Sequence, residues 1–274
     1  MKSISSPIPE ESYGVLYRDS CHSALDEAVE QIKRLGFAVI DSGLTSLEIH
    51  DLSNGFDRTY MEYIAKFGRQ RLESLNEIHT IRAMMTHGDH AFIRLATNRV
   101  LIKLISRLIN GKFILNQQNG VINPPGETYN QAAWHRDLPY QHFVSSTPLA
   151  INALFCIDDF TAENGATFVL PSSHRSESFP SESYIMRNAI QIEAKAGQFI
   201  VLDCMLFHSG GFNDSKRRRR AVNHVYTIPY FKQQVKLPAL LENLNLSPEE
   251  KDIFGFSFTE PISVDQLLDA RAKK

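Results

Sequence analysis

Apolar residues recur at helical spacing through the first hundred residues of the chain. A helix is predicted over residues 23–36, with Ser23 as its N-cap and Gly36 as its end. A second helix is predicted over residues 46–67, although the Asn54-Gly55 pair weakens the pattern at its centre. Shorter elements are expected as a strand at 37–41 and helices at 91–96 and 99–109.

The pattern changes from Phe113 onward. Short runs rich in β-branched and aromatic residues alternate with turn sequences such as PPGE and AENG. Strands are expected within 113–122, 148–157, 166–171, 189–194, 199–207 and 221–231. Many short strands at this spacing favour a sandwich or barrel over a parallel sheet. The expected fold is therefore mainly β with flanking helices, a double-stranded β-helix (a cupin-like jelly roll) packed by N-terminal helices.

No composition shift or linker divides the chain. We therefore expect one domain over residues 1–274. Its helical part would cover about 1–110, the jelly roll about 111–235, and a C-terminal tail 236–274.

Composition indicates which partners and which compartment are expected, but not the activity. The 274 residues carry a formal net charge of −2, which gives no electrostatic reason to expect nucleic acid or an anionic membrane as a partner. The apolar runs are shorter than the ~20 residues of a membrane helix, and the first residues hold no apolar segment typical of a signal peptide. Three cysteines do not indicate a disulfide framework. These features predict a cytoplasmic protein.

The sequence Trp-His-Arg-Asp contains a candidate metal site. In an extended strand His135 and Asp137 project to the same face, and His208, at the end of an apolar run, can supply a third ligand. Two imidazoles and one carboxylate form the facial triad of non-haem iron(II) oxygenases. An H-x-D triplet alone is weak evidence, since chance supplies many. Glu127 and Asp203 are rival carboxylates, but neither shares the strand geometry.

An arginine follows at a suitable place. Arg219 stands eleven residues after His208 (219 − 208), where a new strand begins, so a hairpin would return it towards the metal. A guanidinium suits the distal carboxylate of 2-oxoglutarate, whose keto-acid end would occupy two metal positions. Alone, the run Arg217–Arg220 is more often a solvated turn or a nucleic-acid patch, and its register leaves Arg220 as an alternative.

Four stretches together resemble the phytanoyl-CoA dioxygenase family of Fe(II)/2-oxoglutarate oxygenases. They are INPPGETYNQAAWHRD, NGATFVLPSSH, AGQFIVLDCMLFHSGGFND and RRRRAVNHVY. The resemblance implies that His135, Asp137 and His208 bind Fe(II) and act in catalysis. It further implies that Arg219 and Gln118 contact 2-oxoglutarate, with O₂ as the oxidant and ascorbate as an aid to activity.

The chain departs from this family at two positions near the expected co-substrate, one of them Leu154, where some relatives carry a tryptophan. Family members often carry a serine two residues after the distal histidine, and here that residue is Gly210. A carboxylate is retained at Asp137, whereas halogenating relatives replace it with a small residue. Hydroxylation or a related oxidation of a small molecule, with release of succinate and CO₂, is therefore expected.

The substrate is the least constrained part of the prediction. Candidate contacts are Arg82, Tyr140, Gln141 and His174, although His174 can equally brace its own loop. A polar small molecule is favoured over an acyl-CoA, because no further basic tract suits a CoA phosphate. Two other classes remain open: a cupin-like zinc hydrolase or isomerase, and a non-catalytic small-molecule binding protein. The chain is expected to be a monomer or homodimer.

Overall fold

Two antiparallel sheets form the centre of the computed structural model, which describes residues 8–9, 11–88, 90–138 and 140–272. The larger sheet has six strands in the order β1-β7-β4-β9-β3-β2, and the smaller has three in the order β6-β5-β8. The strands are β1 (Phe37–Asp41), β2 (Thr80–Ile81), β3 (Ile114–Asn123), β4 (Ala150–Cys156), β5 (Thr167–Val169), β6 (Ile190–Ile192), β7 (Gln198–Asp203), β8 (His208–Ser209) and β9 (Arg219–Thr227). The expected jelly-roll architecture is confirmed.

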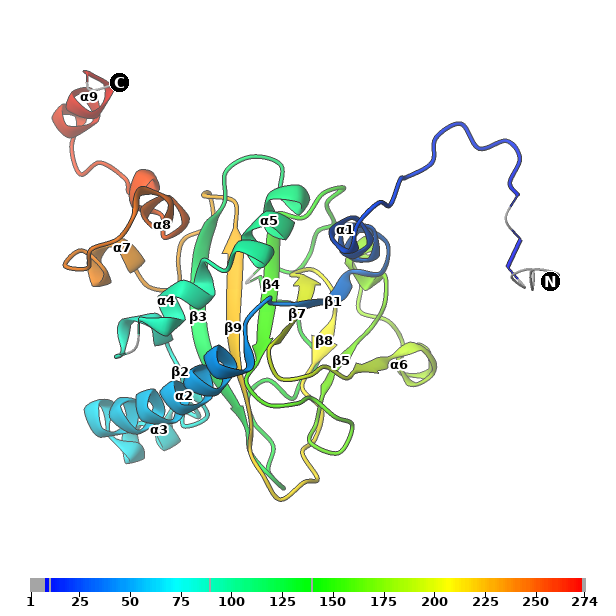
Figure 1. Cartoon of the computed structure of the whole chain (residues 1–274), viewed down its shortest axis with the longest axis horizontal. Helices are drawn as coiled ribbons and strands as arrows, with labels where there is room; N and C mark the ends of the chain where they lie inside the picture. Colours follow the sequence, from blue (N-terminus) through cyan, green and yellow to red (C-terminus); the bar gives the residue numbers. More distant parts are fainter. Residues whose placement is uncertain (1–7, 10, 89, 139, 273–274) are drawn as a thin grey trace.

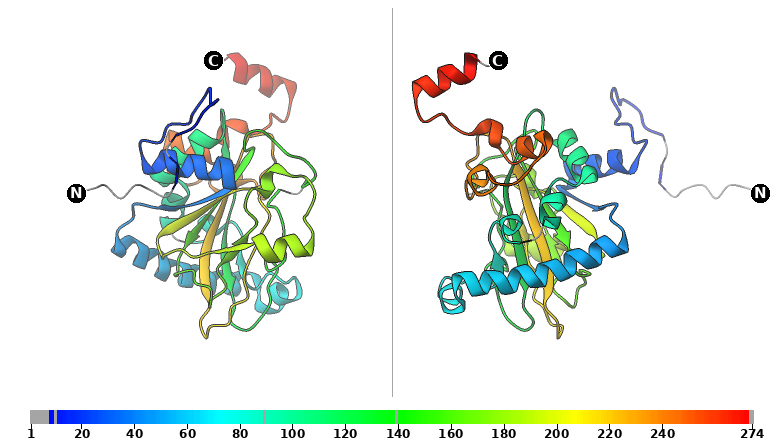
Figure 2. Two further views of the ribbon diagram at one scale, coloured as in Figure 1. Left: turned by 90° about the vertical axis from the view of Figure 1, so that its right-hand side faces the viewer. Right: turned by 60° about the vertical axis from the view of Figure 1, so that its left-hand side comes forward.

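Helices cover one face of the larger sheet. They are α1 (Ala24–Leu35), α2 (Ser46–Phe67), α4 (Ala91–Ala96) and α5 (Arg99–Leu108), and the views show α2, α4 and α5 against the strands (Figures 1 and 2). Apolar side chains from these helices and from the outer face of the sheet form the main core, with Phe56, Leu101 and Tyr226 fully buried. The Tyr226 hydroxyl also donates to the Ala96 carbonyl at 2.6 Å. The helical layer is thereby fixed to β9.

Local sequence accounts for the helix ends. The Ser23 side chain accepts from Asp26, and Gly36 ends α1 in the left-handed conformation that glycine adopts readily. Thr45 and Glu48 form a capping box at the start of α2. The Asn54-Gly55 pair does not interrupt α2, because Gly55 lies on the buried side of the helix and packing outweighs its low helix propensity.

The described C-terminal residues, 236–272, fall into two parts. The segments α7 (Leu237–Leu240) and α8 (Pro248–Ile253) pack on the main core through buried Leu237 and Phe254. In contrast, α9 (Val264–Ala272) has no buried residue and stands away from the body of the molecule (Figure 1). The remaining short helices are α3 (Arg69–Ser74), α6 (Glu182–Asn188), and the 3₁₀ turns η1 (Met84–Thr86), η2 (Ser173–Arg175) and η3 (Phe256–Phe258). In the described part of the chain, no helix is long and apolar enough to span a bilayer.

A second, smaller core lies between the two sheets. Cys156, Phe160, Ile200, Leu202 and Ala221 are among its buried residues. Phe160 follows β4, and the other four come from the inner faces of β4, β7 and β9, opposite the helical layer. The residues of the candidate site face this space between the two sheets.

Candidate metal centre

Backbone pairing brings the two candidate histidines together. His135 and His208 form an antiparallel bridge, in which each backbone N–H donates to the other residue's carbonyl at 3.0 and 3.1 Å. Two residues further on, the Asp137 N–H donates to the Cys204 carbonyl at 3.1 Å. The imidazole rings lie with their centroids 4.3 Å apart. The predicted neighbours are therefore held by main-chain hydrogen bonds as well as by side-chain packing.

Hydrogen bonds orient all three side chains towards one point. The His135 and His208 Nδ1 atoms donate to the carbonyls of Ala133 and Leu206 at 2.8 and 3.0 Å. A carbonyl only accepts, so each Nδ1 carries the proton and each Nε2 keeps a free lone pair. Asp137 Oδ1 lies 4.0 and 3.6 Å from the two Nε2 atoms. Its Oδ2 is already engaged by a 2.8 Å hydrogen bond from the side chain of Asn152.

This donor set fits a divalent transition metal. Single ligand atoms of His135, Asp137 and His208 all lie within 4.8 Å of one another. Ligands about 2.1 Å from a metal and at right angles would be ~3 Å apart, so small movements close the site. Burial lowers the pKa of His208, which favours the neutral imidazole that metals require. Two neutral imidazoles and one carboxylate would leave a bound divalent cation with one net positive charge.

Arg136 stands between two of the candidate ligands and fastens their strand to its surroundings. Its side chain is only 2% exposed, and its guanidinium lies 3.9 Å from the centre of the Phe207 ring. It donates to five backbone carbonyls, those of Met205 (2.7 Å), Gln141 (2.7 Å), Glu177 (3.1 Å), Ser173 (3.0 Å) and Ser176. The H-x-D strand is thereby tied both to the turn before His208 and to the loop around η2.

A buried, incompletely paired guanidinium lines the same cavity as the histidines. Arg219 is 4% exposed and lies 3.9 Å from the centre of the Phe160 ring. Its Nη2 contacts the Tyr129 hydroxyl at 3.3 Å, but Nε and Nη1 have no hydrogen-bond partner among the described residues. A buried cation with unused donors is costly unless an anion joins it. The site therefore fits a carboxylate ligand that also reaches the metal.

Strand alternation places the side chains of Arg219 and Arg220 on opposite faces of β9. Arg220 points to the opposite face of β9, where its guanidinium pairs with Asp158 at 2.7 Å and Asp57 at 3.0 Å. It also donates to the Ser53 hydroxyl and carbonyl. Only Arg219 of this pair faces the cavity with the histidines.

Gln118 does not line this cavity. Its amide donates to the Phe92 carbonyl at 2.7 Å and lies 3.0 Å from His224 Nε2, so it faces the helical layer. The rival carboxylates are also elsewhere: Glu127 lies 3.8 Å from His79, and Asp203 lines a hollow on the other side of β7.

The four candidate substrate residues are not among those that line the metal cavity. Arg82 is ion-paired with Glu77 at 2.6 Å. His174 lies 3.3 Å from the Lys33 carbonyl at the end of α1 and therefore braces its loop. Tyr140 is 63% exposed, and Gln141 is held by hydrogen bonds with Arg136.

Sequence reasoning did not single out three polar residues that line the metal cavity. Asn152 and Asn223 are polar positions within apolar strands, which is a signal that could have been used. Tyr129 lies in an irregular loop and gives no such signal. A Cβ at Gly210 would lie 2.0 Å from the Tyr129 hydroxyl oxygen, so glycine at this position makes room for that hydroxyl.

A jelly roll that encloses a two-histidine, one-carboxylate centre beside a buried arginine defines a non-haem, metal-dependent oxygenase. Comparison with known families agrees: the model described as phytanoyl-CoA dioxygenase matches residues 32–221. The chain belongs to the phytanoyl-CoA dioxygenase family, and it is an oxidoreductase of the iron- and 2-oxoglutarate-dependent dioxygenase class.

Relatives with similar sequences include proteins of bacteria and fungi. An uncharacterized protein of Mycobacterium tuberculosis is 32% identical over 219 residues, which cover 78% of this chain and 79% of that protein. The dioxygenase sphC of Aspergillus fumigatus is 26% identical over 222 residues, covering 76% of this chain and 60% of the other.

Solved structures share the fold. The structure of EctD from S. alaskensis with bound Fe has a TM-score of 0.64 at 21% identity, covering 79% of this chain and 80% of that one. The epimerase SnoN from nogalamycin biosynthesis has a TM-score of 0.59 at 18% identity, covering 82% and 90%.

Proposed function

We propose that this chain hydroxylates a polar small molecule with Fe(II), 2-oxoglutarate and O₂. In the balanced reaction, a substrate C–H bond becomes C–OH, and 2-oxoglutarate becomes succinate and CO₂. His135, Asp137 and His208 would hold the metal, and Arg219 would bind the distal carboxylate of 2-oxoglutarate. The iron, when bound, supplies the centre at which O₂ is reduced as the keto acid loses CO₂.

The observation that carries this proposal is the incompletely paired guanidinium of Arg219 in the metal cavity. A zinc hydrolase needs an open metal position but no buried cation beyond it. A keto-diacid needs both an open metal position and a buried cation, because its keto-acid end binds the metal and its other end is a carboxylate. The Nε and Nη1 groups of Arg219 have no partner among the described residues and remain available to donate to such a carboxylate.

The chain's own residues have distinct tasks in this scheme. Asn152 donates a hydrogen bond to Asp137 Oδ2 and so leaves Oδ1 to face the metal. Tyr129 positions Arg219 through its hydroxyl. Carbonyl acceptors hold both imidazoles in the tautomer that leaves Nε2 free.

Polar side chains in the cavity support a polar substrate. Gln131, Thr167 and Asn223 line the space around the metal ligands. The Oδ1 of Asn223 has no hydrogen-bond partner among the described residues, so it can accept from a bound molecule. An acyl chain would leave these groups unpaired.

Binding and turnover can be tested separately. Anaerobic titration of the Fe(II)-loaded protein with 2-oxoglutarate should show saturable binding, for example by calorimetry, and binding should be lost in Arg219→Ala. Succinate release should then rise in the presence of a suitable polar substrate with Fe(II) but not with Zn(II). Absence of 2-oxoglutarate binding to the Fe(II) protein would exclude the proposal.

We also propose that the enzyme is cytoplasmic and works as a monomer or homodimer, in a single domain. The three cysteines are free, with Cys21 exposed and Cys156 and Cys204 buried, which suits a reducing compartment. Sedimentation measurements would establish the oligomeric state.

A further inference from the structure

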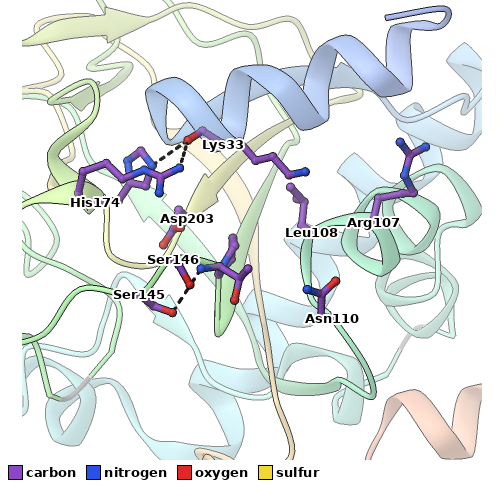
Figure 3. A pocket seen from close by; sticks show the side chains of 11 residues that line it. Lys33, Arg107, Leu108, Asn110, Ser145, Ser146, His174 and Asp203 are labelled. Atoms are coloured by element: carbon purple, nitrogen blue, oxygen red, sulfur yellow. Dashed lines mark hydrogen bonds between the residues drawn. The ribbon is translucent and has the colours of Figure 1, made fainter. Parts of the chain in front are cut away.

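A second hollow lies on the other side of the larger sheet from the metal cavity. Adjacent residues of β7 point to opposite sides, so Leu202 lines the metal cavity whereas Asp203 lines this hollow. Its volume is about 230 Å³. Figure 3 shows the side chains that line it, which come from α1 (Lys33), α5 and the residues after it (Arg107, Asn110), the loop before β4 (Ser145, Ser146), η2 (His174) and β7 (Asp203).

Positive charge surrounds the hollow. Lys33, Arg107 and Arg175 line it, and Asp203 is the single carboxylate in its lining. The Lys33 ammonium forms no ion pair or hydrogen bond within the described residues, whereas Arg107 pairs with Asp26 at 3.0 Å. Arg175 donates to the Lys33 carbonyl and so keeps its charge beside the hollow. An anionic group could bind here without displacing an existing ion pair.

Asp203 contributes a largely buried hydrogen-bond acceptor to the hollow. It is 6% exposed, and the one hydrogen bond to its carboxylate comes from the Met205 N–H to Oδ1 at 2.9 Å. The other carboxylate oxygen has no partner among the described residues. Burial raises the pKa of this group to about 6, which is consistent with an incompletely solvated carboxylate. This oxygen is available to accept a hydrogen bond from a ligand with a hydroxyl or amino donor.

We propose that this hollow is a second ligand site, separate from the metal cavity, for a small organic anion that carries a hydroxyl or amino donor. Lys33, Arg107 and Arg175 would attract the anionic group, a phosphate or a carboxylate. Asp203 would accept a hydrogen bond from the donor, and the hydroxyls of Ser145 and Ser146 lie along the same wall.

The hollow shares a turn with the metal ligands. Asp203 begins the turn that leads to His208, and the next residue, Cys204, accepts the Asp137 N–H through its carbonyl. The Leu206 carbonyl in the same turn accepts from His208 Nδ1. A ligand on Asp203 therefore contacts the segment that orients two metal ligands.

The site can be tested by calorimetry on the metal-loaded full chain. Glycerol 3-phosphate and glycerate serve as hydroxylated probes, and propyl phosphate and propionate as their counterparts without the donor. We expect one hydroxylated probe to bind with a Kd below about 1 mM and to be at least about tenfold tighter than its counterpart. Lys33→Glu and Asp203→Asn should each weaken this binding by about tenfold or more.

Two controls separate this hollow from other sites. Lys216→Glu makes the same charge change at an exposed position in the loop before β9, outside the lining of the hollow, and it should leave binding unchanged. Asp137→Ala removes a metal ligand and should also leave probe binding unchanged. The proposal is overturned if neither hydroxylated probe binds, if the donor makes no difference, if Lys33→Glu and Lys216→Glu behave alike, or if Asp137→Ala abolishes binding. Because Lys33 is exposed, its variant tests the site independently of any change in stability caused by Asp203→Asn.

Discussion

Adding a single methyl group at Gly210 should weaken binding of 2-oxoglutarate without touching the metal ligands. In Gly210→Ala the new Cβ would lie 2.0 Å from the Tyr129 hydroxyl oxygen and 2.8 Å from the ring carbon that bears it. Since such contacts require about 3 Å or more, the Tyr129 hydroxyl must move by roughly 1 Å. Its 3.3 Å contact with Arg219 would then be lost.

The magnitude follows from the loss of a hydrogen bond to a charged group. Such a bond contributes about 1.5–3 kcal/mol, and about 1.4 kcal/mol corresponds to a tenfold change in affinity. We therefore expect the Kd for 2-oxoglutarate to rise by about 10- to 100-fold. The steric clash between the new Cβ and Tyr129 should also lower the free energy of unfolding by about 1–3 kcal/mol.

A double-mutant cycle provides the assay. Anaerobic calorimetry would measure 2-oxoglutarate binding to the wild type, Gly210→Ala, Tyr129→Ala and the double variant, with metal affinity measured in parallel. The two substitutions should be strongly non-additive, because the alanine methyl group has nothing to displace once the tyrosine is gone. Equal losses from Gly210→Ala in the presence and absence of Tyr129 would refute the reasoning.

Three further predictions test the surroundings of the site. Arg219→Ala should abolish detectable 2-oxoglutarate binding. Arg220→Ala should retain binding but lower thermal stability, because the ion pairs of Arg220 lie on the opposite face of β9. Calorimetry measures the binding, and thermal unfolding measures the stability. Arg136→Ala should cost more than about 3 kcal/mol in urea unfolding, since five carbonyls lose their donor. Burial raises the pKa of Asp203 to about 6, so its carboxyl group binds a proton more tightly in the native state than in the unfolded state. The free energy of unfolding therefore falls as the pH rises from about 4 to 6. Asp203→Asn should therefore be more stable than the wild type above pH ~6, by up to about 3 kcal/mol in urea titrations, and the difference should shrink below pH ~4.

Regular elements and the metal ligands were predictable from sequence because both depend on short-range spacing. The helix over residues 24–35 has its cap, its apolar stripe and its terminal glycine within fourteen residues. His135 and Asp137 are two residues apart, so any extended conformation places them on one face. The tight packing of Tyr129 against Gly210 joins residues far apart in the chain, and no local pattern encodes it.

Gln118 shows where local pattern fails. The register between β3 and β9 shifts between Leu115 and Gln117, so the alternation of faces cannot be counted from the start of the strand. After this irregularity Gln118 pairs with His224 and faces the helices, whereas Asn223 faces the cavity. A run of polar residues carries no hydrophobic alternation from which such a shift could be inferred.

The geometry of the metal centre depends largely on main-chain atoms of the turn after β7. The carbonyl of Cys204 accepts the Asp137 N–H, that of Met205 accepts from Arg136, and that of Leu206 accepts from His208 Nδ1. Since these acceptors belong to the backbone, substitutions at positions 204–206 that keep volume would preserve the ligand geometry. A change of turn length would instead displace all three acceptors at once. The spacing between Asp203 and His208 is therefore a stronger constraint on this site than the side chains that lie between them.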